Sequence, residues 1–265
     1  MKLFHFGAKA APLLGTLHTP SSLSRPKAAV LLCNPFGEEA MRAHRIYRVL
    51  ATQLTRHDYA ALRFDYSCSG DSLGDSRDAS VPTWLSDIEL ALDEVLQRSK
   101  ATQCAVFGLK LGATLAATAF AEKSLPAQHL VLWDPAIDGQ QYLEELAESH
   151  NRYLRMEFGA AYVAPQRTTG TVAEALGHPI GSRLGGEIAS LGLMKLKRFP
   201  ERVTVISTQS HPRSPLLREY LEDRTRLEWV EPVSEHWNSD EALNRAVVPM
   251  PVIEAIAASL QKDFR

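Results

Sequence analysis

The sequence predicts an α/β fold in which a mostly parallel sheet is covered by helices on both faces. Short apolar runs alternate along the chain with stretches whose apolar residues repeat at helical spacing, and this alternation is typical of a parallel sheet. The chain has 265 residues, of which 45% are hydrophobic and 23% charged. This composition is ordinary for a globular domain with a sizeable core, and it excludes disordered and fibrous proteins.

Charge and cysteine content exclude further classes of protein. Lysine and arginine number 29 against 31 acidic residues, a formal net charge of -2, so no basic field exists to hold nucleic acid. The first residues lack the apolar core of a secretory signal, and no apolar run is long enough to span a bilayer. Cys33, Cys68 and Cys104 lack metal-ligand spacing and are expected to be free thiols. We therefore expect a cytoplasmic protein that binds a small molecule and needs neither metal nor cofactor, with a homodimer left open.

The first predicted elements are a buried strand, a turn and a helix. Residues 28–33 (AAVLLC) form a near-continuous apolar run, as expected of a strand buried on both faces, and the turn residues 34–37 (NPFG) end it. Between residues 43 and 56 the apolar side chains share one helical face. Residues 60–64 are the next predicted strand.

The middle of the chain repeats this alternation. A second helical stripe covers residues 85–96 and follows the start signal Pro82-Thr83. Residues 103–107 (QCAVF) are the next buried strand, and Gly108 opens a sharp turn into an alanine-rich helix over residues 111–122. The remaining predicted elements are strands over residues 129–133, 202–207 and 227–230 and a final helix from about Pro251.

The alternation breaks between Asp138 and Pro200, where a polar, helix-like stretch precedes a glycine-rich segment with no buried strand. We expect residues 138–200 to be a helical cap inserted over the ligand crevice, which in open α/β sheets lies beyond the carboxyl ends of the strands. The core would then comprise residues 1–137 and 201–265. A structural subdomain or a dimer contact is the alternative, because loop length alone does not show that a segment gates a site.

Residues 104–116 (CAVFGLKLGATLA) have the pattern of a nucleophile elbow, a strained strand-turn-helix in which glycines flank the reactive residue. Gly108 and Gly112 occupy the two glycine positions. The residue at the tip is Lys110, where such a turn normally presents serine, cysteine or aspartate. The chemistry expected of the motif is therefore missing.

Four segments carry a resemblance to a known family. They are residues 33–39 (CNPFGEE), 64–74 (FDYSCSGDSLG), 108–112 (GLKLG) and 132–135 (LWDP). In this order and spacing the chain resembles the α/β-hydrolase-fold superfamily and is most similar to the exosortase A system-associated hydrolases of PEP-CTERM loci. The resemblance covers most of the chain, and it implies an eight-stranded, mostly parallel sheet with an inserted helical cap.

The same resemblance implies where a catalytic triad would lie. In an intact member, a nucleophile at the elbow, an acid after a later strand and a histidine after the last strand meet at the carboxyl edge of the sheet. The nucleophile position maps to Lys110 and the histidine position to His236. The usual acid position falls in residues 208–211, which hold no carboxylate, whereas Asp134 stands at an alternative position one strand earlier.

The resemblance also implies an oxyanion hole formed by the backbone N–H of Leu111 and one from the loop containing Phe36 and Gly37. Backbone donors survive any change of side chain, so the site could still bind a polarised carbonyl. His236 has a bland alternative as a hydrogen-bonded loop histidine beside Trp237, since the elbow offers no hydroxyl for it to deprotonate.

Three interpretations of Lys110 stay open. Its ammonium can pair with Asp134, Glu38 or Glu39 as a structural or ligand-anchoring cation. It can instead be a desolvated amine that acts as a base or a Schiff-base nucleophile, or an inert residue beside a site built from others. Ser72 is a substitute hydroxyl in the loop after an earlier strand, where polar side chains usually hold the turn.

Two functions follow from these residues. The favoured one is a non-catalytic or strongly altered hydrolase homologue that binds a small acyl or anionic ligand in the cap-covered pocket. The alternative is an active hydrolase or acyl-transfer enzyme on an ester, thioester or amide, using water or a non-standard nucleophile with Asp134 and His236. The first is favoured because loss of one triad member lowers the rate of triad enzymes by about 10⁴ to 10⁶.

Overall fold

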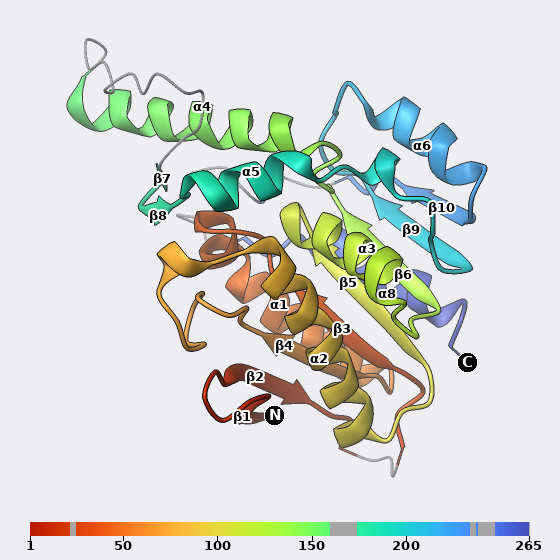
Figure 1. Cartoon of the computed structure of the whole chain (residues 1–265). Helices are drawn as coiled ribbons and strands as arrows, with labels where there is room; N and C mark the ends of the chain where they lie inside the picture. The colour runs from red at the N-terminus through yellow and green to blue at the C-terminus, as the bar shows by residue number, and fades with distance from the viewer. Residues whose placement is uncertain (22–24, 160–173, 234–236, 238–246, 265) are drawn as a thin grey trace.

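The computed structural model describes residues 1–21, 25–159, 174–233, 237 and 247–264. Within them the chain forms an eight-stranded sheet with the strand order β1-β2-β4-β3-β5-β6-β9-β10, flanked by helices (Figure 1). Its strands are β1 (Lys2–Phe6), β2 (Leu13–His18), β3 (Ala29–Cys33), β4 (Ala60–Phe64), β5 (Cys104–Leu109), β6 (His129–Trp133), β9 (Arg202–Ile206) and β10 (Arg226–Val230). The six strands from β4 to β10 in this order pair in parallel. The mostly parallel sheet implied by the resemblance is therefore confirmed.

The strands at the centre of the sheet are those that the apolar runs predict. Every residue of β3, β5, β6 and β9 is buried, because helices cover both faces of these strands. β10, at one edge of the sheet, is half-buried at most positions.

The amino-terminal hairpin was not predicted from the sequence. β1 pairs antiparallel with β2, and β2 pairs antiparallel with β4, so these strands extend the sheet by hydrogen bonding to its other edge. β1 is mostly exposed, and its short, mixed sequence (KLFHF) contains no apolar run. Only the unpaired edge of β4 gives this segment its strand conformation.

Helices cover both faces of the sheet (Figure 1). The helices are α1 (Glu38–Arg56), α2 (Val81–Ser99), α3 (Leu111–Lys123), α4 (Gly139–Phe158), α5 (Ser182–Ser190), α6 (Ser214–Glu222) and α8 (Met250–Gln261), with short 3₁₀ turns η1 (Ser76–Asp78) and η2 (Leu193–Lys195). Of these, α4 and α5 lie above the carboxyl edge of the sheet (Figure 1). The apolar faces of α1 and α8 pack on one side, and those of α2 and α3 pack on the other. α3 is buried over most of its length, which explains why small alanines fill it.

Residues 138–200 join β6 to β9, and α4 and α5 of this segment lie beyond the carboxyl ends of the strands (Figure 1). Asp138 begins α4 by accepting a hydrogen bond from the backbone N–H of Gln141 at 3.0 Å. α4 packs against α5, and a side chain at Gly139 would overlap the carbonyl oxygen of Ile188. The segment also contains the two-stranded hairpin β7 (Glu174–Ala175) and β8 (His178–Pro179). Its role as a cap stays a prediction.

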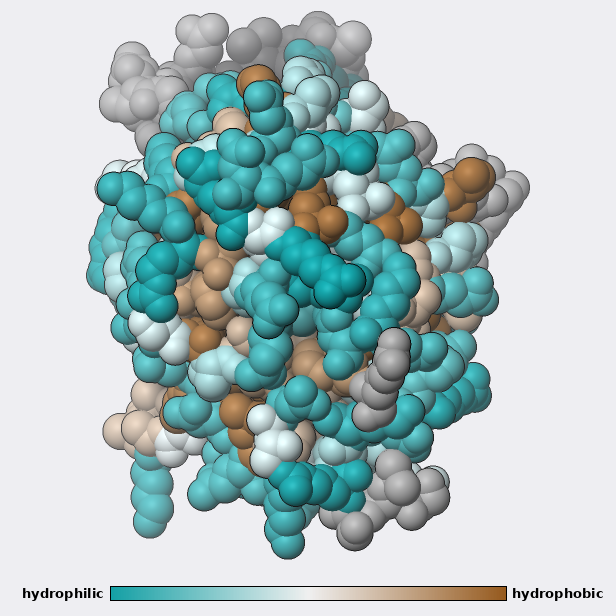
Figure 2. All heavy atoms as spheres, turned by 90° about the vertical axis from the view of Figure 1, so that its right-hand side faces the viewer, coloured by the Kyte–Doolittle hydropathy of each residue, from teal (hydrophilic) through white to brown (hydrophobic). Residues whose placement is uncertain are grey.

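Two observations bear on the expected partners. Within the described residues, every helix is too short or too polar to cross a membrane. Figure 2 shows the side of the molecule that lies to the right in Figure 1, where hydrophilic residues cover most of the surface and hydrophobic ones appear in small, separated groups. The homodimer stays untested.

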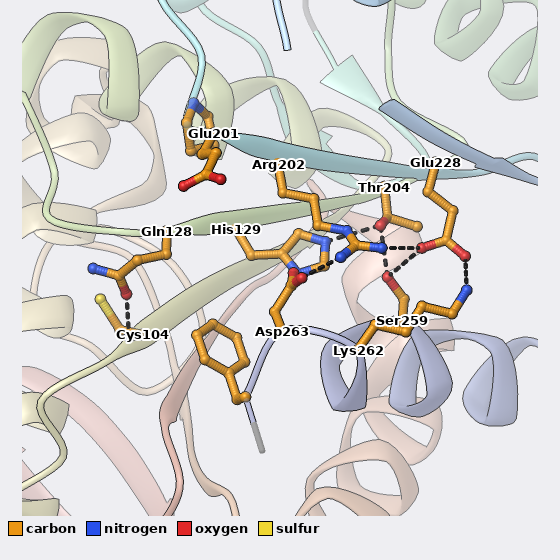
Figure 3. A network of polar contacts seen from close by, with 12 residues as sticks. Cys104, Gln128, His129, Glu201, Arg202, Thr204, Glu228, Ser259, Lys262 and Asp263 are labelled. Carbon is orange, nitrogen blue, oxygen red and sulfur yellow. Dashed lines mark hydrogen bonds and ion pairs between the residues drawn. The ribbon is translucent and has the colours of Figure 1, made fainter. Parts of the chain in front are cut away.

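A buried polar network holds α8 against the amino-terminal ends of β6 and β9 (Figure 3). Arg202 forms ion pairs with Asp263 and, at 3.2 Å, with Glu228. His129 Nε2 lies 2.8 Å from the hydroxyl of Thr204. Its Nδ1 lies 2.7 Å from Asp263, without the alignment of a hydrogen bond. This network stands at the opposite end of the strands from Lys110.

Candidate functional site

Lys110 has the backbone of a nucleophile elbow. It lies between β5 and α3 with φ 51° and ψ -123°, a conformation that side chains other than glycine rarely adopt. A Cβ atom at Gly108 would come within 2.5 Å of the backbone of Ala113, and one at Gly112 would overlap the carbonyl oxygens of Asn34 and Cys33. Both glycines are therefore required. The sequence motif forms the strained turn that it predicts, with an amine at its tip.

The Lys110 ammonium contacts a neutral group. Nζ donates to Oε1 of Gln209 at 3.2 Å. In the described part of the chain no carboxylate oxygen lies within 4.0 Å of Nζ. The predicted ion pair with Asp134, Glu38 or Glu39 is therefore not formed.

The carboxylate of Asp134 is hydrogen-bonded to the loop after β9. One carboxylate oxygen accepts from the backbone N–H of Thr208 at 2.7 Å and of Gln209 at 3.2 Å, and the other accepts from the hydroxyl of Thr208. Asp134 is buried and itself has a positive φ of 39°. All of these donors belong to Thr208 and Gln209, so the carboxylate connects the end of β6 to the loop that carries Gln209. His236, the predicted partner in an acid-base pair, lies outside the described residues.

Glu38 and Glu39, two of the candidate partners of Lys110, have other contacts. Glu38 pairs with Arg42 one turn along α1 at 2.8 Å. Glu39 is instead buried and accepts a hydrogen bond from the hydroxyl of Tyr142 of α4 at 2.8 Å. Burial raises the pKa of Glu39, against the opposing effects of the Lys110 charge and the Tyr142 hydrogen bond. This contact joins α1 to residues 138–200.

His211 is a residue that the sequence reasoning missed. Its Nδ1 accepts from the backbone N–H of Arg213 at 3.0 Å, and its Nε2 lies 2.9 Å from the side-chain amide of Gln141 and 3.9 Å from Glu145. Burial lowers its pKa, as do the charges of Lys110 and Arg213, while Glu145 raises it. The signal in the sequence is the histidine that ends residues 208–211, the loop where the usual acid position falls.

Lys110, Asp134, Gln209 and His211 line one cavity of about 210 Å³. Its other wall comes from α4, which contributes Gln141, Tyr142 and Glu145. The cavity therefore lies between the carboxyl edge of the sheet and residues 138–200.

The three residues predicted for the oxyanion hole are only partly brought together. Leu111 is the first residue of α3, so its backbone N–H has no intrahelical acceptor. Phe36 and Gly37 instead line a second cavity, where the ring of His178 packs against both. The part of all three residues in an oxyanion hole stays a prediction.

The hydroxyl of Ser72, the substitute nucleophile, has structural hydrogen bonds. The hydroxyl of Ser72 donates to the carbonyl oxygen of Asp65 at 2.6 Å and accepts from the backbone N–H of Leu14 at 2.9 Å. It therefore holds its turn against β2. Burial raises the pKa of Cys68, which makes its thiolate less available. Among the described residues no group of histidine, cysteine and carboxylate side chains is placed to hold a metal ion.

Comparison with known proteins finds a family and a set of related folds. The family model described as serine aminopeptidase, S33, matches residues 24–175. Comparison with curated protein sequences gives no significant match.

Three solved structures illustrate the likeness in fold. Est1E from Butyrivibrio proteoclasticus, with ferulic acid bound, has a TM-score of 0.70 at 14% identity, with 98% of each chain covered. A soluble variant of monoglyceride lipase from Saccharomyces cerevisiae has a TM-score of 0.65 at 14% identity, with 100% of this chain and 96% of that one covered. Proline iminopeptidase from Mycobacterium smegmatis has a TM-score of 0.63 at 13% identity, with 98% of each chain covered. At these identities the likeness shows the α/β-hydrolase fold alone.

Proposed function

Because the chain belongs to the serine aminopeptidase S33 family of α/β-hydrolase-fold proteins, we propose that it is a hydrolase homologue whose elbow binds a small anionic ligand instead of attacking an ester or amide. The ligand class is a short carboxylate or an acyl group that carries negative charge. It would occupy the cavity between Lys110 and α4.

One observation carries this proposal. Lys110 places a cation at the amino terminus of α3, where the helix dipole favours an anion. The ammonium donates a hydrogen bond to the neutral amide of Gln209. The helix dipole disfavours a cation in that position. The carboxyl group of Glu39 offsets this effect in part, since burial raises its pKa and the Lys110 charge lowers it. A bound carboxylate would interact favourably with both the ammonium and the helix dipole.

His211 lines the same cavity, and both of its ring nitrogens are engaged within the protein. Its Nδ1 accepts from the backbone N–H of Arg213 at 3.0 Å, and its Nε2 lies 2.9 Å from the side-chain amide of Gln141. The proposal therefore rests on the ammonium of Lys110.

The size and charge of the cavity limit the ligand. A volume of about 210 Å³ is below the range of about 300 to 1,000 Å³ for drug-sized ligands. Asp138 and Glu145 also line this cavity. Asp138 is compensated by Arg213 at 2.9 Å, whereas Glu145 is half exposed and disfavours a large polyanion. A ligand with a single carboxylate fits both limits.

The test is titration calorimetry with butyrate, using butanol as the neutral analogue. We expect butyrate alone to bind, and Lys110→Met to weaken it by about tenfold or more, the effect of losing a charge-assisted contact. Lys123→Met is the matched control, because Lys123 ends the same helix and contacts only the exposed Ser86. Equal binding by wild type and Lys110→Met would exclude the proposal.

A hydrolysis assay separates the proposal from an active enzyme. We expect p-nitrophenyl butyrate to be hydrolysed no faster by the wild type than by Lys110→Met. Turnover that is abolished by His211→Gln or His236→Gln would instead establish catalysis by a non-standard site.

A further inference from the structure

The exposed side of α1 carries basic residues and no acidic ones. Residues 40–56 of this helix include four arginines and contain neither aspartate nor glutamate. Five exposed residues are spaced by three or four positions, so they form one line along the helix, opposite the apolar face that packs on the sheet. We call them the α1 stripe: Met41, Arg45, Arg48, Thr52 and Arg56. The net charge of -2 is a sum over the whole chain and does not show this local excess.

The arginines of the stripe have no acidic partner within the described residues. No carboxylate oxygen there lies within 4.0 Å of Arg45, Arg48 or Arg56. The two carboxylates of α1 lie in its first turn, and both have other partners. Asp58, which follows the helix, lies 3.9 Å from Lys27. The positive charge of the stripe is therefore not neutralised by ion pairs of the fold.

The helix itself explains one of these arginines. Arg56 lies in the last turn of α1, where the helix dipole favours a cation. Arg45 and Arg48 lie in the middle of the helix, three residues apart, and like charges at this spacing destabilise a helix. An excess of positive charge that lowers the stability of its own helix indicates a negatively charged partner outside the protein.

Two exposed apolar side chains adjoin the arginines. Met41 begins the stripe, and Met41 and Leu3 of β1 both line the second cavity, which has a volume of about 840 Å³. Their exposed fractions are 68% and 64%. Arg63 lines this cavity as well, but Asp65 and Asp71 share it and offset its charge. The positive charge of the surface therefore comes from the three arginines of the stripe.

This combination of side chains matches an anionic lipid bilayer better than a nucleic acid. Each basic residue close to an anionic leaflet strengthens binding by about fivefold. The phosphates of a nucleic acid would also attract the arginines, but they would leave Leu3 and Met41 in water. At a bilayer, both side chains can enter the boundary between headgroups and acyl chains, where burial of apolar surface adds to the attraction.

We propose that the α1 stripe, together with Leu3, is a docking surface for an anionic membrane leaflet. The helix lies parallel to the bilayer, and its arginines face the headgroups over about 22 Å of helix. None of these residues lines the Lys110 cavity. The proposal therefore does not depend on the function proposed above.

Flotation of the full chain with vesicles is the experiment. We expect the protein to float with vesicles of phosphatidylcholine and phosphatidylglycerol and to stay behind with phosphatidylcholine alone. Binding should weaken by about tenfold or more between about 0.1 M and 1 M salt, because the screening length falls from about 10 Å to about 3 Å. Fluorescence anisotropy with a short DNA duplex tests the other polyanion, and we expect weaker binding than to the anionic vesicles.

Variants locate the contact on α1. Arg45→Gln combined with Arg48→Gln should weaken vesicle binding by about 25-fold, the product of two fivefold effects. Leu3→Gln should weaken it by about threefold or more, because an apolar contact with the bilayer is lost. Lys197→Gln combined with Arg198→Gln is the matched control. It removes the same charge from exposed side chains near the end of α3, on the other face of the sheet, and should change binding by less than about twofold.

Three results would overturn the proposal. One is flotation that does not depend on the anionic lipid, or no flotation with either vesicle. Another is an equal loss of binding in the α1 double variant and in its control, since binding would then follow net charge rather than this surface. The third is binding to the DNA duplex that is as tight as binding to vesicles and unchanged in Leu3→Gln, which would identify a nucleic acid as the partner.

Discussion

At the scale of single residues, the backbone conformation of the elbow does not depend on the side chain at its tip. The strained backbone of Lys110 depends on Gly108, Gly112 and the packing of α3, none of which involves the side chain at the tip. The turn therefore forms with an amine at its tip. The Lys110 side chain contacts Gln209 and lines a cavity.

Replacement of the Lys110 ammonium should cost little stability. Removal of one partner of a buried ion pair destabilises a protein by about 3 to 5 kcal/mol. Lys110 is half-buried and bonded to a neutral amide, so we expect Lys110→Met to change the free energy of unfolding by less than about 1 kcal/mol. Urea denaturation measures this difference. A loss above about 3 kcal/mol would reveal an acidic partner of the ammonium.

The wild-type protein should resist a fluorophosphonate probe of serine nucleophiles. The elbow presents an amine, and the Ser72 hydroxyl is buried and hydrogen-bonded on both sides. Intact-mass spectrometry is the readout, with an active serine hydrolase as positive control. Stoichiometric labelling that persists in Lys110→Met would identify an activated serine elsewhere.

At the scale of elements, close backbone approaches position the site. Gly112 lets α3 begin against the end of β3, and Asp134 ties the end of β6 to the loop after β9. These contacts bring Lys110 and Gln209, which are 99 positions apart in the sequence, within hydrogen-bond distance.

A side chain at Gly112 should therefore destabilise the whole fold. Its Cβ would overlap two carbonyl oxygens of the β3 end, and backbone cannot move aside cheaply. We expect Gly112→Ala to lower the free energy of unfolding by about 2 kcal/mol or more. Gly186→Ala is the control, because Gly186 lies in α5 with open space around it and should gain up to about 1 kcal/mol. Thermal and urea unfolding of both variants decide the point.

At the scale of the whole molecule, the two ends of the sheet carry different features. The carboxyl ends of the strands carry the Lys110 cavity, and the amino-terminal ends carry the buried network that holds α8 (Figure 3). His129 belongs to this network. Burial, reinforced by the charge of Arg202, lowers its pKa from 6.5 to about 3.

The network predicts a loss of stability in acid. Between about pH 6.5 and 3 the unfolded His129 binds a proton that the folded one does not, so stability falls as the pH falls through this window, by up to about 1.4 kcal/mol per pH unit. Burial raises the pKa of Asp263, which acts in the opposite sense at the acidic end of the window. Urea unfolding across this pH range is the measurement. An equally steep slope in His129→Gln would show that other groups cause the loss.

Local pattern alone predicted the parallel strands of the sheet and most of the helices that cover it. Runs such as 60–64 and 129–133 match β4 and β6 residue for residue, because a strand buried on both faces is mostly apolar. The two glycines of the elbow likewise indicate the strained turn, because its close backbone contacts leave no room for a side chain at these positions. The S33 family match and the structural neighbours support the superfamily, and the closer resemblance to exosortase-associated hydrolases stays a prediction.

Only the tertiary structure decided which groups face Lys110. Sequence reasoning chose a carboxylate by charge, but Asp134 is held by backbone N–H groups of the loop after β9, whose position depends on the packing of distant elements. His211 and Gln209 reach the cavity through that same loop. The amino-terminal hairpin depends on β4, because β2 pairs with the edge of β4 that the parallel strands leave free. Charge and pattern are properties of a residue and its neighbours in the chain, whereas a hydrogen-bond partner is a property of the folded arrangement.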